Sequence, residues 1–63
     1  MQQSATNSTL SAAQRVAARI AKGYSIEHLA IATGLTTHEI AISEQDNTIV
    51  PEQHANRIER ALR

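Results

Sequence analysis

The sequence predicts a compact all-α domain of four to five helices. Alanine, the strongest helix former, recurs along the chain, whereas Phe and Trp are absent and Tyr24 is the one aromatic residue. Apolar residues return at spacings of three and four, which is the period of a helix with one buried face. A length of 63 residues allows one domain with a small core, so we expect oligomerisation to supplement its stability.

The chain divides into a short tail and one domain. Residues 1–9 are small and polar and have no apolar periodicity, so we expect them to form a disordered N-terminal tail. Residues 10–63 contain all of the periodic segments and are expected to form the domain.

The first helix is expected at about residues 11–22. Ser11 is its predicted N-cap, with Gln14 completing a capping box, and Gly23 is its predicted stop. The apolar stripe expected to face the core consists of Ala13, Val16, Ala17, Ile20 and Ala21. The side chains expected on the opposite, solvent-facing side are those of Arg15, Arg19 and Lys22.

The second helix is expected at about residues 26–33, with Ser25 as its N-cap. Its short inward face is expected to consist of Ile26, Leu29, Ala30 and Thr33.

The second and third helices are expected to cross at a short turn. Such a pair needs a small residue where the axes approach and a glycine able to take a positive φ, which Ala30 and Gly34 supply. Thr36 can cap the third helix, expected over about 37–45, and Ile40 can anchor it in the core. This pattern predicts a helix-turn-helix.

The fourth helix is expected over about residues 51–62, opened by Pro51 at its first position. Its inward face is expected to consist of Ala55, Ile58, Ala61 and Leu62. Ile49 and Val50, just before it, are expected to be a buried connector. We expect a dimer interface to be built from Ile49, Val50, Ile58 and Leu62.

Several residues of the chain, taken in their order along the sequence, resemble the pattern of a known family. Ala30, Gly34, Leu35, Thr36 and Ile40 follow the pattern of the Cro/cI, or lambda repressor-like, helix-turn-helix domains. Glu44 stands where that family often has an acidic residue closing its third helix. Val50-Pro51-Glu52 and Ile58-Glu59-Arg60-Ala61-Leu62 resemble the ending of small phage Cro-like repressors. The resemblance covers roughly residues 12–62.

The resemblance implies a sequence-specific DNA-binding transcriptional regulator of phage or mobile-element type, expected to act as a repressor. It would bind double-stranded operator DNA as a homodimer, with the third helix in the major groove. The base contacts it implies are Thr37, His38, Ala41, Ile42 and Gln45. The phosphate contacts would come from Arg15, Arg19, Ser25 and Thr36. Two alternatives stay open: Ile42 as a cover for Ile49 or Val50, and the arginines as an ordinary solvated face.

The charge distribution supports a rival interpretation. Residues 25–54 carry five acidic side chains and neither lysine nor arginine, although the whole chain is formally neutral. Duplex DNA binding draws much of its affinity from neutralised phosphates. The alternative is therefore a helix-turn-helix scaffold that binds a protein, as an anti-activator or antitoxin-like partner would.

Composition bears on the remaining function classes. The chain has no cysteine, and its three histidines lack the three- or four-residue spacing that places two ligands on one helix face, so we expect no metal site. We expect no cofactor and no enzymatic activity, because a core this small leaves little room for a concave site. The lack of cysteine and of any long apolar stretch or signal-peptide pattern predicts a cytoplasmic location.

Overall fold

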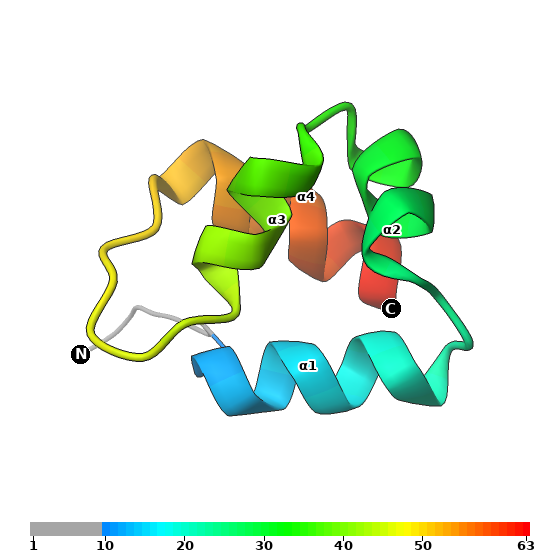
Figure 1. Cartoon of the computed structure of the whole chain (residues 1–63), viewed down its shortest axis with the longest axis horizontal. Helices are drawn as coiled ribbons and strands as arrows, with labels where there is room; N and C mark the ends of the chain where they lie inside the picture. The colour runs from blue at the N-terminus through cyan, green and yellow to red at the C-terminus, as the bar shows by residue number, and fades with distance from the viewer. Residues whose placement is uncertain (1–9) are drawn as a thin grey trace, which may run out of the picture.

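The structure, a computed structural model, describes residues 10–63 and contains four helices and no strand in that range (Figure 1). The helices are α1 (Ala12–Ala21), α2 (Ile26–Thr33), α3 (Thr37–Ser43) and α4 (Glu52–Leu62). The predicted all-α class is confirmed, with a count of four over these residues rather than four to five. None of these helices combines the length and apolar character needed to cross a membrane. The predicted tail, residues 1–9, lies outside the described residues.

The three predicted N-caps are confirmed. Ser11 Oγ accepts a hydrogen bond from the Gln14 backbone N–H at 3.1 Å, and Thr36 Oγ1 accepts one from the Glu39 backbone N–H at 3.0 Å. Both caps are full capping boxes, because the Gln14 and Glu39 side chains accept in return from the backbone N–H of the cap residue. Ser25 caps α2 in the same way with its hydroxyl. Local sequence therefore sets where α1, α2 and α3 begin.

The connection between α2 and α3 begins at Gly34, the C-cap of α2. Its φ of 77° lies in the left-handed region that glycine adopts without strain. Leu35 follows and is buried, and α3 starts at Thr37. The two helices pack against each other, as the green ribbons of Figure 1 show.

The apolar core lies among α2, α3 and α4. The buried hydrophobic residues are Leu29, Ala30, Leu35, Ile40, Ala55 and Ile58. Of the inward positions predicted for the second, third and fourth helices, these include Leu29, Ala30, Ile40, Ala55 and Ile58; Thr33 is also buried, and Ile26 and Ala61 are half-buried. The exposed fraction of the Ile58 side chain is 0%. Its assignment to a dimer interface is therefore wrong, because no atom of it is left for a partner to contact. Leu62 is half-buried and packs against the core.

The orientation predicted for α1 is wrong. Ala13, Ala17 and Ala21 are exposed, Ile20 is 63% exposed, and only Val16 of the predicted stripe is half-buried. Arg15 is instead the one buried residue of α1, with an exposed fraction of 5%. The inward face of α1 thus carries Arg15 with the half-buried Ala12, Val16 and Arg19, and it shares only Val16 with the predicted stripe.

The connection between α3 and α4 also departs from expectation. Ile49 is 94% exposed, so it is not part of a buried connector, whereas Val50 is half-buried. Pro51 is the N-cap of α4 and not its first helical residue, so the helix begins at Glu52, one residue later than predicted. Ile49 is thus a large aliphatic side chain of this connection that is exposed to solvent.

Candidate functional site

The outward face of α3 carries most of the residues expected to contact DNA bases. Thr37, His38 and Gln45 are exposed, while Ala41 and Ile42 are half-buried. On the opposite side of the helix Ile40 and Ser43 are buried, with exposed fractions of 0% and 1%. Residues three, four and seven or eight apart share a helix face. Thr37, His38 and Ala41 thus share one side of α3, and Gln45 is exposed in the turn that follows the helix. We call these four residues the α3 outer face.

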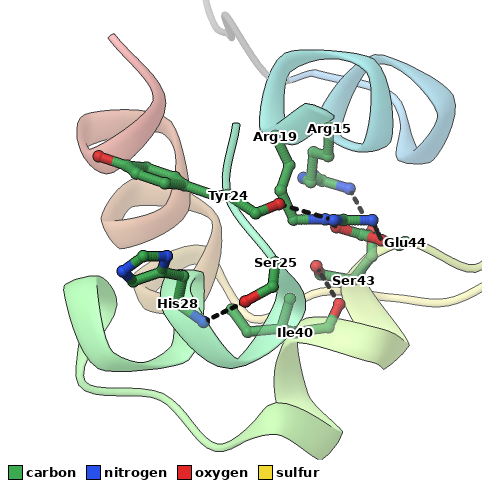
Figure 2. Close-up of polar contacts among 8 residues, drawn as sticks. All are labelled: Arg15, Arg19, Tyr24, Ser25, His28, Ile40, Ser43 and Glu44. Carbon is green, nitrogen blue, oxygen red and sulfur yellow. Dashed lines mark hydrogen bonds and ion pairs between the residues drawn. The ribbon is translucent and has the colours of Figure 1, made fainter. Parts of the chain in front are cut away.

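The C-terminal end of α3 is held by Arg19 of α1 (Figure 2). Its guanidinium makes a two-point contact with the Glu44 carboxylate, with Nε to Oε2 at 2.7 Å and Nη2 to Oε1 at 3.1 Å. Its Nη1 donates to the Tyr24 carbonyl at 2.9 Å. The hydrogen bond to Glu44 raises the pKa of the Arg19 guanidinium. One side chain thereby joins α1, the α1–α2 connection and the end of α3.

Arg15, one turn earlier on α1, reaches the same end of α3. Its Nη1 donates to the Ser43 carbonyl at 3.0 Å, and the Ser43 hydroxyl in turn donates to the Ile40 carbonyl at 2.6 Å (Figure 2). The last carbonyls of a helix lack partners within it and carry partial negative charge, so a guanidinium is a favourable neighbour. The Arg15 Nε has no hydrogen-bond partner among residues 10–63. Arg15 is thus a positioning residue for α3.

These contacts correct the expectation that Arg15 and Arg19 face solvent and bind phosphate. Both guanidinium groups are used inside the domain, and the side chain of Arg19 is 14% exposed. Their guanidinium heads reach acceptors at the C-terminal end of α3. Sequence periodicity gives no sign of this arrangement, because it treats both residues as solvent-facing.

Ser25 and Thr36, the other two expected phosphate contacts, are exposed at the N-termini of α2 and α3. Each hydroxyl oxygen accepts the capping hydrogen bond of its helix. A hydroxyl that accepts still carries its own proton, so each can donate one hydrogen bond to an external oxygen.

Arg57 of α4 is a basic residue near the α2–α3 connection that sequence reasoning did not assign to this site. A β-carbon built at Gly34 would lie 3.8 Å from Arg57 Nη1. Arg57 is exposed, and its charge also helps to lower the pKa of Glu39 in the first turn of α3. Its placement depends on how α4 crosses α2, which no local pattern encodes.

Glu39 is held at the N-terminus of α3 from two sides. The backbone N–H of Thr36 donates to its carboxylate at 2.9 Å, and this hydrogen bond is the main reason that the pKa of Glu39 is lowered. His54 Nε2 of α4 lies 3.8 Å from the other carboxylate oxygen. Glu39 thus serves the cap of α3 rather than its outer face.

The site therefore consists of a short helix fixed at both ends, with a largely polar outer face and the exposed guanidinium of Arg57 nearby. No protein-family model matches this chain, and neither a curated protein nor a solved structure is significantly similar to it.

Proposed function

We propose that this chain is a sequence-specific DNA-binding regulator, in which α2 and α3 act as a helix-turn-helix and α3 enters the major groove. The observation that carries the proposal is that α3 is anchored at both ends while its outer side chains are exposed. Both of its ends are anchored, by the Thr36 capping box and by Arg19, while Thr37 and His38 remain in solvent. A recognition helix needs this combination of a fixed orientation and side chains free to contact base edges. Repression by occlusion of a promoter is the proposed mechanism.

The backbone contacts of this proposal are assigned to Ser25, Thr36 and Arg57. The two cap hydroxyls retain a proton to donate, and Arg57 is the exposed cation beside Gly34. This set replaces the arginines of α1, whose guanidinium groups hold α3. With few cations near α3, we expect moderate affinity and a shallow dependence on salt concentration.

The test is a titration of the protein against the duplex upstream of its own gene, at two salt concentrations. We expect selective binding that weakens as salt is added. The double variant Thr37→Ala, His38→Ala should lose the preference for its site over unrelated DNA by about tenfold or more, because two base contacts disappear. Binding to unrelated DNA should change little in that variant.

Arg57→Ala is the matched variant for the backbone contact. It should weaken binding to all sequences alike and lower the salt slope by about one, since one phosphate contact is lost. Arg63→Ala, which also removes one exposed positive charge from the C-terminal part of the chain, is the control. If the double variant Thr37→Ala, His38→Ala binds as selectively as the wild-type protein, the proposed role of α3 is contradicted. If the wild-type protein shows no selective DNA binding, the proposed function is contradicted.

We further propose that the protein acts as a homodimer through the α3–α4 connection. Ile49 is 94% exposed and is followed by the half-buried Val50, so a twofold contact there would cover aliphatic surface next to α3. Sedimentation velocity should detect a dimer that Ile49→Asp converts to monomer without unfolding the domain. Ile31→Asp, which changes an isoleucine 80% exposed on α2, is the control. A wild-type protein that stays monomeric on and off DNA would contradict this interface.

A protein-interaction module is the second candidate function. Ile20 on α1 and Ile31 on α2 are 63% and 80% exposed, and apolar side chains of this size on the surface favour a protein partner. The titration against DNA distinguishes the two candidates. A protein-interaction module shows no selective binding to the duplex at either salt concentration, whereas a DNA-binding regulator does.

A further inference from the structure

The α3 outer face contains no cation. Its four residues are Thr37, His38, Ala41 and Gln45, and the first and last lie eight positions apart. The backbone N–H of Gln45 donates to the Ile42 carbonyl at 3.1 Å, so Gln45 lies exposed in the turn that directly follows the last residue of α3, Ser43. The face therefore offers base pairs a defined set of groups: one hydroxyl, one imidazole, one carboxamide and the methyl groups of a threonine and an alanine.

The groups that recognise G·C pairs are missing from this face or are engaged elsewhere. Guanine presents two acceptors in the major groove and is read best by arginine or lysine. The guanidinium groups of Arg15 and Arg19 are turned to the buried end of α3 instead. Cytosine presents a donor that Glu or Asp would accept, but Glu39 serves the cap of α3 and Glu44 is paired with Arg19.

The groups that remain match A·T pairs. A carboxamide offers a donor and an acceptor together, as the N7 and N6 edge of adenine requires, so Gln45 is suited to adenine. The methyl groups of Thr37 and Ala41 are suited to the C5-methyl of thymine. His38 supplies a single donor when neutral, which is too little for a two-point contact with guanine.

We propose that the α3 outer face selects duplex DNA whose contacted positions are A·T pairs, with Gln45 contacting adenine and Thr37 and Ala41 contacting thymine methyl groups. This inference rests on the proposed function, since it specifies the DNA that the same helix binds. Both ends of α3 are anchored within the domain, so these side chains are presented to the DNA in one orientation.

The test is selection of the full chain against a random duplex library, followed by sequencing of the bound DNA. We expect enriched sites in which the contacted positions are A·T. Gln45→Arg should change one of these positions from A·T to G·C, with a change in preference of about 5- to 150-fold, which is the discrimination that a good two-point base contact provides. Circular dichroism establishes that the variant remains folded.

Gln53→Arg is the matched control, because it makes the same substitution at an exposed position of α4. The added charge should strengthen binding to all DNA while leaving the selected bases unchanged. Wild-type sites with G·C at the position altered by Gln45→Arg would overturn the A·T assignment and leave the proposed function standing. If no sequence is enriched by the wild-type protein, the proposed function fails and the A·T assignment fails with it.

Discussion

Replacing Ile58 by alanine is expected to lower the free energy of unfolding by about 2–5 kcal/mol. Its side chain is fully buried among Leu29, Leu35 and Ile40, so truncation leaves a cavity in addition to the lost burial. The core of residues 10–63 has few large aliphatic side chains, and small domains are only marginally stable. Urea denaturation followed by circular dichroism measures the change, and Ile58→Val, expected to cost about 0.5–1.5 kcal/mol, remains measurable if the alanine variant is unfolded.

Ile49→Ala is the control for this prediction. Ile49 is 94% exposed, so its truncation is expected to change the stability of the monomer by less than about 0.5 kcal/mol. The sequence analysis assigned both Ile49 and Ile58 to a dimer interface. The two variants separate their roles, since Ile58 packs in the core and Ile49 is exposed to a partner. Equal losses of stability in Ile49→Ala and Ile58→Ala would contradict this division.

Glu44→Ala is expected to lower the free energy of unfolding by about 1.5–3 kcal/mol. The carboxylate accepts two hydrogen bonds from Arg19, and its removal leaves a guanidinium that is 14% exposed without its charged partner. Under the proposed function, Glu44→Ala should also weaken DNA binding, because the C-terminal end of α3 is then no longer held by Arg19. Thermal denaturation of the variant, together with the titration described above, tests both effects.

A double-mutant cycle isolates this contact. Arg19→Ala removes the hydrogen bond to the Tyr24 carbonyl as well as those to Glu44, so it should be the more costly of the two single variants. The double variant should be less destabilised than the sum of the single ones, since both charges are then absent. Strictly additive losses would indicate that the pair contributes no coupling.

The elements that follow local rules could be predicted from the sequence. Ser11, Ser25 and Thr36 act on backbone groups within three residues, so their capping roles do not depend on the rest of the fold. The same holds for Gly34, whose left-handed conformation ends α2. The outer positions of α3 follow from the burial of Ile40 by simple helical period.

The orientation of α1 could not be predicted, because it depends on a partner 25 or more residues away in the sequence. Apolar periodicity assumes that the neighbouring surface is apolar. α1 packs against α4 and also reaches the C-terminal end of α3, which presents the Ser43 carbonyl and the Glu44 carboxylate to it. The guanidinium groups of Arg15 and Arg19 satisfy those acceptors, and Ala13, Ala17 and Ala21 are left exposed.

The position of Arg57 could not be predicted for a similar reason. A residue at the surface of α4 carries no local sign that Gly34 lies beside it. Ile49 was misplaced because short aliphatic runs before a helix are usually buried, whereas the connection here turns Ile49 outward and Val50 partly inward.

Because α1 turns Arg15 and Arg19 toward the rest of the domain, both guanidinium contacts and apolar burial hold the domain together. Every buried aliphatic residue in the described chain lies from Leu29 onward, whereas α1 contributes a buried arginine. Cooling weakens apolar burial and has no comparable effect on guanidinium contacts, and salt screens partly buried charges only weakly. The first helix is therefore held in part by guanidinium contacts to the end of α3, whereas α2, α3 and α4 are held together by apolar burial.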